Sequence, residues 1–349
     1  MTNSLIVASN IIFVKGFKKN LIIDLQNDCW YHVDFVLEKN EDIENLDQET
    51  LEYMLSENMI FEIPHSLKKR FKPFNLSYSQ PDKIENAIID RNNESDYSLQ
   101  KAIDFLNSKR NKHLQIRWFE TCNLKDLDLI LTLTEYSPCE CIELILPFDV
   151  NITQIIARKE KYLKIDNIIV HSVPSGTDVS PYKTKSVFFT HEKITSSDNC
   201  GQISPFIFTA KQTHVLKAIN YNTCLFNKIG IDVNGEVKNC PSLKQSFGNI
   251  SEYSSKKTIK MDYSIGKIKK DEIEVCSDCE FRYVCSDCRA FTDSSQRKTA
   301  RPSKCDYNPF IAKWRKESDF ISLENSGVVS NETNFSINYE KISQINNDI

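Results

Sequence analysis

The chain has 349 residues, which is enough to bury a substantial core and to form two or three domains. Its 44 Lys and Arg residues against 48 Asp and Glu residues give a net charge of −4, which argues against non-specific nucleic-acid binding over the whole surface. Neither a long apolar run, nor a basic-then-apolar signal segment, nor a glycine-rich phosphate loop occurs. We therefore expect no membrane span, no export and no such nucleotide site.

Short β-rich segments open the chain. Strands are predicted at residues 11–17, 20–25, 29–33 and 59–63. Residues 47–57 predict a helix, because their apolar side chains recur at helical spacing and Asp47 is a suitable N-cap. This order of strands and a helix predicts a compact module at residues 1–72.

Strands and helices alternate in the middle of the chain. Strands are predicted at residues 75–79, 114–119, 141–146, 166–171 and 185–190, and helices at 99–106, 125–134 and 153–161. Such alternation implies βαβ units with parallel strands, so the fold class is α/β. A partial (β/α) barrel fits the repeated alternation better than a six-stranded nucleotide fold, and we assign residues 73–205 to it.

A hairpin is predicted close to the first cysteines of the C-terminal part. Two apolar segments, 229–233 and 236–239, flank the dipeptide Asn234-Gly235. Asn-Gly between alternating strands is the strongest short hairpin signal. Cys240 is therefore expected at the end of a hairpin, within a third domain at residues 206–318.

The end of the chain has a different composition. Residues 319–349 are rich in Asn, Ser and Glu and show little hydrophobic periodicity. A segment of this kind buries too little apolar surface to offset the entropy of ordering it. We therefore predict that this tail is disordered.

Seven of the twelve cysteines gather in one quarter of the chain. They are Cys224, Cys240, Cys276, Cys279, Cys285, Cys288 and Cys305. Thiolates are soft ligands suited to iron–sulfur clusters or zinc. Without a secretory signal we expect a reducing, cytoplasmic location, where cysteines are metal ligands or free thiols. Small buried apolar side chains are the expectation for Cys29, Cys122, Cys139 and Cys141.

The spacing of these cysteines supports a more specific interpretation. The pattern C-x10-G-x4-C, then C-x2-C-x5-C-x2-C, then a last cysteine closely resembles the SPASM domain, which extends many radical S-adenosylmethionine enzymes that modify ribosomal peptides. One departure is that two residues, where the family usually has three, separate Cys285 from Cys288. The segments IDVNGEVKNCPS, SFGNI, IEVCSDCEFRYVCSDCRAF and VKGFKKNLIIDLQ are similar to the SPASM-type maturases that accompany ATP-grasp ligases in grasp-with-spasm peptide systems.

This resemblance implies two [4Fe–4S] clusters that share the seven cysteines. Cys276, Cys279, Cys285 and Cys305 would hold one cluster, and Cys224, Cys240 and Cys288 would hold the other. The second set lacks a fourth ligand. Cys200 is the candidate, because it lies in a polar loop and is followed by Gly201, where a chain can approach a cluster closely.

The radical-generating motif of that superfamily is missing. No CxxxCxxC sequence occurs anywhere, so we expect a degenerate barrel that does not use S-adenosylmethionine. Two alternatives stay open. One is an active radical enzyme with a displaced cluster on Cys122, Cys139 and Cys141; the other is a binding module stabilised by zinc.

The N-terminal module is the expected partner-binding element. The resemblance implies that it recognises the leader of a precursor peptide, by adding an extended segment to a sheet edge. Lys18-Lys19 and Lys68-Lys69-Arg70 could steer an acidic peptide toward it. The implied partners are this peptide and an ATP-grasp ligase, with no nucleic acid and no membrane. The six histidines show no ligand spacing and are expected to be ordinary core or surface residues.

Overall fold

The computed structural model describes residues 3–37, 40–81, 84–149, 151–182 and 184–348, and it divides into two compact units. The first unit consists of Met1–Ser79, Gln202–Thr223 and Lys267–Ile349, and the second of Gln80–Gly201 and Cys224–Gly266. The chain passes from one unit to the other four times, so the N-terminal module and the last cysteines belong to the same unit. The domain boundaries near residues 72, 205 and 318 stay a prediction.

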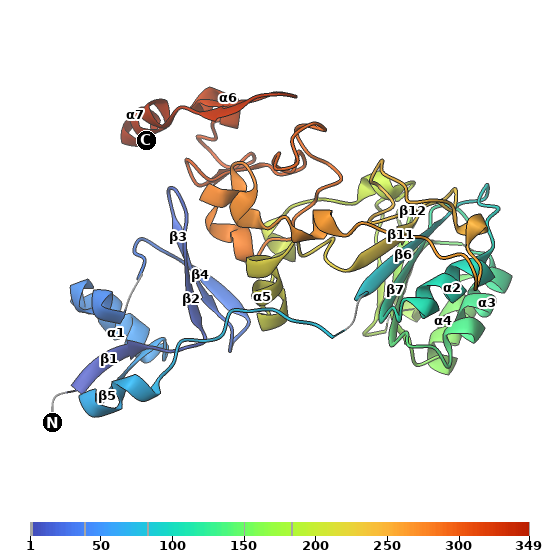
Figure 1. The fold of residues 1–349 in the computed structure, drawn as a ribbon, viewed down its shortest axis with the longest axis horizontal. Coiled ribbons are helices and arrows are strands. Elements are labelled where there is room, and N and C mark those ends of the chain that lie inside the picture. The colour runs from blue at the N-terminus through green and yellow to red at the C-terminus, as the bar shows by residue number, and fades with distance from the viewer. Residues whose placement is uncertain (1–2, 38–39, 82–83, 150, 183, 349) are drawn as a thin grey trace. The chain divides into compact units, whose positions relative to one another are not determined.

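A seven-stranded sheet forms the second unit, in the order β10-β9-β8-β7-β6-β11-β12 (Figure 1). Its strands are β6 (Asn86–Arg91), β7 (His113–Trp118), β8 (Cys141–Pro147), β9 (Ile165–His171), β10 (Val187–Phe189), β11 (Lys228–Ile231) and β12 (Val237–Lys238). All neighbours are parallel except β11 and β12, which form the antiparallel hairpin predicted around Gly235. The predicted mixed α/β class is confirmed, as a mostly parallel sheet.

Three helices connect strands of this sheet and lie together on one side of it in Figure 1. They are α2 (Leu99–Ser108), α3 (Leu124–Thr134) and α4 (Ile152–Lys161), close to the predicted ranges. The side chains of Ser98 and Asn123 cap the first two by accepting hydrogen bonds from backbone N–H groups. Their buried apolar faces complete one core with the sheet.

The first strand of the sheet corrects one prediction. Residues 75–79 form no strand; the first strand is β6, where five of six residues are buried. Consecutive burial of this kind is typical of a strand covered on both faces, and the strand lacks the apolar–polar alternation on which the prediction relied. The residues after β6 are Asn92, Asn93 and Glu94, so this strand is not followed by a cysteine motif either.

The N-terminal part of the first unit has the predicted strands and helix. It contains β1 (Asn3–Val7), β2 (Ile11–Lys15), β3 (Asn20–Asp24), β4 (Cys29–Val33), α1 (Gln48–Ser56) and β5 (Ile60–Pro64). β2, β3 and β4 form an antiparallel meander, and β1 pairs with β5. The Asp47 carboxylate accepts a 2.9 Å hydrogen bond from the Thr50 N–H, so it is the N-cap of α1 as predicted.

The meander packs directly on the cysteine-rich segment. Val14 and Leu21 share a core with Phe281 and Val284, and the short helix α5 (Gln212–Asn220) adds Val215 to it. At Gly16 a Cβ atom would lie 2.9 Å from Glu280 and 2.2 Å from the Lys19 carbonyl oxygen. Only glycine permits this close approach.

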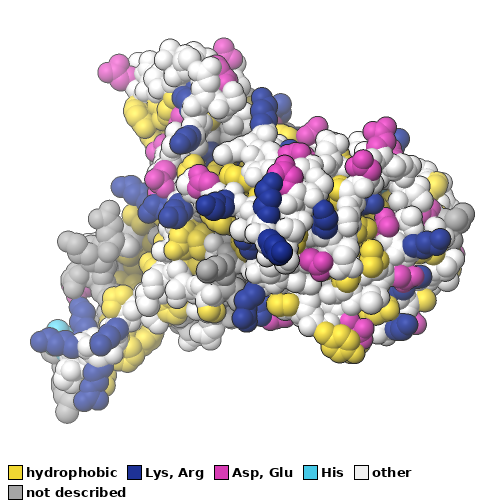
Figure 2. Space-filling model, turned by 45° about the vertical axis from the view of Figure 1, so that its right-hand side comes forward, with side chains coloured by type: hydrophobic (Ala, Val, Ile, Leu, Met, Phe, Trp, Pro, Cys, Tyr) yellow, Lys and Arg dark blue, Asp and Glu magenta, His cyan; other side chains and the backbone are white. Residues whose placement is uncertain are grey.

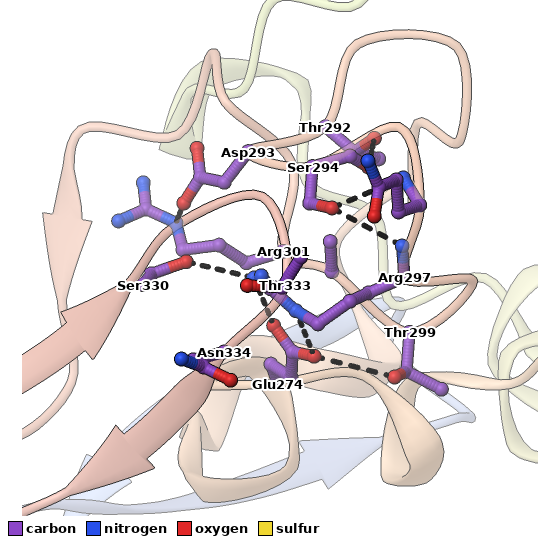
Figure 3. Close-up of polar contacts among 12 residues, drawn as sticks. Glu274, Thr292, Asp293, Ser294, Arg297, Thr299, Arg301, Ser330, Thr333 and Asn334 are labelled. Carbon is purple, nitrogen blue, oxygen red and sulfur yellow. Dashed lines mark hydrogen bonds and ion pairs between the residues drawn. The ribbon is translucent and has the colours of Figure 1, made fainter.

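The C-terminal tail is ordered in the structure, which corrects the predicted disorder of residues 319–349. After β13 (Tyr307–Asn308) and β14 (Lys313–Trp314) the chain forms α6 (Leu323–Ser326), β15 (Val328–Ser330), β16 (Phe335–Ile337) and α7 (Tyr339–Asp348). Val328 and Ile342 pack with Phe310 and Val275 in a small core. Polar contacts add to this attachment: the Arg297 guanidinium binds Glu274 and donates to Ser330 Oγ (Figure 3).

Within the described residues, no helix is both long and apolar enough to cross a bilayer.

Candidate metal centres

Three cysteines of the first unit lie at one buried core, and a fourth, Cys276, precedes them in the chain. Cys285 is part of this core, and Cys279 and Cys305 pack against it. Cys276 follows Val275, whose φ of 65° is an unusual conformation for a β-branched residue. Strain of this kind persists only where the surroundings enforce it. Here the surroundings fix the backbone at the point where it enters the first CxxC pair.

The pKa values show that these four thiols influence one another. Burial raises the pKa of Cys285 to about 12, and the charges of Cys305 and Cys276 add to this increase. Burial also raises the pKa of Cys279 well above its usual range, with further contributions from Glu280 and from the other three thiols. The four cysteines that the resemblance assigns to one cluster are therefore within electrostatic range of each other.

A buried lysine lies among these thiols. Lys270 is 4% exposed, and its Nζ donates a hydrogen bond of 3.3 Å to Cys285 Sγ. Burial lowers the pKa of this ammonium group, but the charges of Cys285 and Cys276 outweigh that effect and raise the pKa overall. Among the described residues, no carboxylate forms an ion pair with Lys270. A buried cation of this kind is stable only beside an anion, so Lys270 favours the thiolate form of Cys285 and opposes the effect of burial on its pKa.

The second unit contains a smaller group with the same composition. Cys240 is buried, and burial together with the Cys224 charge raises its pKa to about 11, against the opposing charge of Lys228. Lys228 Nζ donates a hydrogen bond of 3.4 Å to Cys224 Sγ. Cys200 is exposed, and its charge also contributes to the raised pKa of Cys240. The structure thus brings Cys200 near the two cysteines of the hairpin region.

The hairpin that carries Cys240 depends on two glycines. Gly235 has a φ of 79°, the left-handed conformation that the predicted turn requires. At Gly230 in β11, a Cβ atom would lie 2.4 Å from Pro241 Cδ and 2.8 Å from the Cys240 carbonyl carbon. Cys240 can therefore fold back onto β11 only because this position has no side chain.

A single metal ion and an iron–sulfur cluster require different arrangements of these thiols. In the described part of the chain, no three His, Cys, Asp or Glu side chains converge closely enough to hold a single metal ion. Zinc with Zn–S bonds of about 2.3 Å would need such convergence. A [4Fe–4S] cluster takes its thiolates at four separate corners and needs a wider arrangement. The four thiols that affect one another's pKa, of which Cys285 is buried and the other three are half-buried, have the all-sulfur composition of that donor set.

The remaining predicted ligand, Cys288, belongs to the first unit. It follows Asp287, which is buried and paired with Arg289 at 2.9 Å. Its assignment to the second cluster stays a prediction.

The structure separates the cysteines of the displaced-cluster alternative. Cys122 follows the carboxyl end of β7, whereas Cys141 begins β8 opposite His113. Since β7 and β8 are parallel, these residues lie beyond opposite ends of β7, whose six residues span roughly 16 Å. Cys139 precedes Cys141 and is on the side away from Cys122. These thiols cannot share one cluster, and burial raises the pKa of Cys122 to about 12, as in an inert core thiol.

Charged residues occupy the carboxyl edge of the sheet, where α/β proteins usually bind ligands. Asp90 is the last but one residue of β6 and is bound by Arg117 of β7 in a buried pair. His171 ends β9, and its Nε2 lies 3.0 Å from the Trp118 carbonyl oxygen. Burial lowers the pKa of this histidine, which is the behaviour of a neutral core residue.

A groove of about 880 Å³ lies beside β2 in the first unit. Within the described sheet β2 pairs only with β3, so its other edge faces the groove. Ile12 and Phe13 line one side, and Phe71, which is 48% exposed, lines another. Three basic residues complete the lining, namely Lys68, Arg70 and Lys72. Figure 2 shows Lys and Arg side chains beside hydrophobic ones in the N-terminal part of the molecule.

Comparisons with known proteins give limited information. No protein-family model matches the chain, and no curated protein is similar enough in sequence to count as a relative. Among solved structures, the fold is similar to the crystal structure of SuiB from Streptococcus suis, with a TM-score of 0.32 and 12% sequence identity. The similarity covers 82% of this chain and 96% of SuiB. A TM-score of 0.32 supports no argument about the sites, whose roles are therefore inferred from the residues described above.

Proposed function

We propose that this chain is an iron–sulfur protein that takes part in the maturation of a ribosomally made peptide. It binds the precursor in the groove of its N-terminal module and works beside an ATP-grasp ligase, either as a maturase or as an adaptor that presents the substrate. The observation that carries the proposal is the group of four coupled thiols around Lys270. The peptide-system context comes from the sequence resemblance.

The cysteines have distinct roles in this proposal. Cys276, Cys279, Cys285 and Cys305 hold one [4Fe–4S] cluster in the first unit. Cys200, Cys224 and Cys240 supply ligands to a second cluster, for which the sequence adds Cys288. Clusters at these positions would transfer electrons or hold the fold. The protein itself buries Cys285 in the first site and Cys240 in the second, which limits access of water and oxygen to these two sulfur ligands.

The groove suits an extended acidic peptide. A peptide strand added along β2 would satisfy backbone hydrogen-bonding groups at that edge. Its apolar side chains would contact Phe13 and Phe71, and its carboxylates would lie near Arg70 and Lys72. The groove and the first group of thiols belong to the same unit.

Metal and sulfide analysis tests the central part of the proposal. The protein is purified without oxygen and assayed for iron, zinc and acid-labile sulfide. We expect iron and sulfide in equal amounts, with iron approaching the content of two clusters. Bound zinc without sulfide would replace this proposal by the zinc-stabilised binding module.

Peptide binding is tested separately. Genes for short precursor peptides next to the gene for this chain supply the probe, and fluorescence anisotropy measures binding of their leader segments. We expect saturable binding that weakens with salt. An ATP-grasp ligase encoded beside the same precursor would support the proposed partner, and its co-purification with this chain would test the interaction directly.

A further inference from the structure

We propose that Lys270 and Lys228 are built-in counter-charges that raise the reduction potentials of the two clusters, one lysine for each site. The inference rests on the proposed function, because it concerns the clusters that the thiols are proposed to hold. It assigns to these lysines a role that the cysteine pattern does not contain.

Lys270 shows the arrangement most clearly. Its side chain is almost completely buried, and its Nζ contacts Cys285 Sγ at 3.3 Å. Two other cations lie near these cysteines and have carboxylate partners: Arg289 pairs with Asp287 at 2.9 Å, and Arg301, which donates to the Cys305 carbonyl oxygen, pairs with Asp293 at 3.5 Å. Lys270 therefore provides the positive charge that remains available to the sulfur ligands of the first site.

Lys228 repeats this arrangement in the second unit. It begins β11, is half-buried, and contacts Cys224 Sγ at 3.4 Å. Within the described residues no carboxylate pairs with it, although Lys238, also in the hairpin, pairs with Asp232 at 2.6 Å. Two unrelated segments thus place one lysine against one cysteine sulfur in each thiol group.

An ordinary structural lysine would behave differently. Lysine side chains usually extend their ammonium group to solvent, or pair it with a carboxylate when buried. Here the hydrogen-bond acceptor is sulfur in both sites. The simplest physical account is that each site carries net negative charge when it is occupied, and that the lysine compensates part of it.

The electrostatic effect has a definite sign. One-electron reduction of a cluster adds one negative charge and breaks no bond. A cation nearby stabilises the reduced form, so the reduction potential is higher with the lysine than without it. Lys270 is more deeply buried than Lys228, and its charge is less screened. Its removal should therefore have the larger effect.

The test uses Lys270→Met and Lys228→Met in the full chain, which remove the charge and keep a long side chain. Exposed lysines in the same units, Lys267→Met and Lys256→Met, are the matched controls. Each protein is purified without oxygen, titrated with dithionite, and followed by electron paramagnetic resonance. Iron and sulfide content and circular dichroism are measured in parallel.

In Lys270→Met we expect the reduction potential of one cluster to become more negative. In Lys228→Met we expect the potential of the other cluster to become more negative by a smaller amount. In the two controls both potentials should stay at their wild-type values. Unchanged potentials in clusters that are retained would overturn the inference. If Lys270→Met loses its cluster, Lys270→Arg decides: restored iron with a potential near that of the wild type supports the charge role, and continued loss overturns it. A wild-type protein without iron and sulfide would refute the proposed function itself, which is a separate result.

Discussion

Arg117 holds the carboxylate of Asp90 through two hydrogen bonds, from Nε at 2.6 Å and from Nη2 at 2.8 Å. Both residues are buried, at the ends of neighbouring parallel strands. Burial raises the pKa of Asp90, and the Arg117 charge opposes this increase. Ligands usually bind at this edge of the sheet. Here the edge holds an ion pair in which Asp90 and Arg117 are each other's partner.

Replacing one partner of this pair should be costly. In Arg117→Met the Asp90 carboxylate would be left buried without a counter-charge, and we expect the free energy of unfolding to fall by about 3–5 kcal/mol. The double variant Asp90→Leu/Arg117→Met should recover most of this loss. Urea denaturation at pH 7 measures both.

The pH dependence of this variant provides a second check. Without Arg117 the folded-state pKa of Asp90 should rise further above its unfolded value of about 3.9. A raised carboxyl pKa destabilises the folded state at neutral pH and has no effect below the unfolded pKa. The gap between variant and wild type should therefore shrink as the pH falls toward 4. A gap that stays constant would argue against a buried ionised Asp90.

Replacing Cys285 and Cys122 in turn should distinguish a cluster ligand from an ordinary core thiol. Cys285 and Cys122 are both buried, and burial raises the pKa of each to about 12. Only Cys285 lies beside other thiols and a lysine. We expect Cys285→Ala to lose roughly half of the bound iron, and Cys122→Ala to retain all of it. Equal losses in the two variants would mean that iron content reports folding alone.

A glycine next to the second site gives an independent test of the hairpin geometry. Because a Cβ at Gly230 would collide with Pro241 and Cys240, Gly230→Ala should displace Cys240 from its place beside Cys224. We expect loss of the iron of the second site with the first site retained, and a similar but weaker effect for Cys200→Ala. Electron paramagnetic resonance distinguishes the two clusters. Gly176→Ala is the control for backbone strain without a collision, since its φ of 82° disfavours alanine but its Cβ would meet no atom within 4 Å.

Charge reversal in the groove should weaken peptide binding. Arg70 lines the groove and Lys69 does not, although both are exposed and adjacent in the chain. We expect Arg70→Glu to weaken binding of an acidic leader peptide about tenfold at low salt, with a smaller difference at high salt. Lys69→Glu should bind as the wild type does. Equal weakening in both variants would show that only the overall charge matters, and would argue against the groove.

Prediction from sequence succeeded where local patterns and tertiary contacts agree. The periodic helices after Ser98 and Asn123 and the turn at Gly235 follow from nearest-neighbour chemistry, and they appear in the structure. The strand β6 was missed because it is buried on both faces and shows no alternation. Lys270 and Lys228 were missed as well, since a lysine at a sulfur atom leaves no pattern in its own segment. Spatial proximity alone reveals them.

The tail was mispredicted for a similar reason. Its few apolar residues, among them Val328 and Ile342, are spread too thinly to form a core of their own, but Phe310 and Val275 complete one with them. Composition describes a segment in isolation and does not include the surface on which it packs. The hydrogen bond between Arg297 and Ser330 in Figure 3 is likewise invisible to local sequence patterns, because the two residues are far apart in the chain.

Loss of Arg297 should release this tail. Its guanidinium donates two hydrogen bonds to Glu274, at 2.9 and 3.0 Å, and one to Ser330 Oγ at 2.9 Å. These bonds link the segment before Cys276 to β15. We expect Arg297→Met to weaken the attachment by about 1–3 kcal/mol, because charge-assisted bonds are lost and Glu274 keeps no equivalent partner.

Limited proteolysis measures this release. In the wild type the loop between β15 and β16 is exposed but both strands are anchored, so cleavage there should be slow. In Arg297→Met cleavage should be roughly ten times faster, as about 1.4 kcal/mol shifts the opening equilibrium tenfold. Arg315→Met is the control, because its pair with Asp306 is exposed and outside this contact. Rapid cleavage of the wild-type tail would mean that these contacts do not hold it and that the disorder predicted from composition was correct.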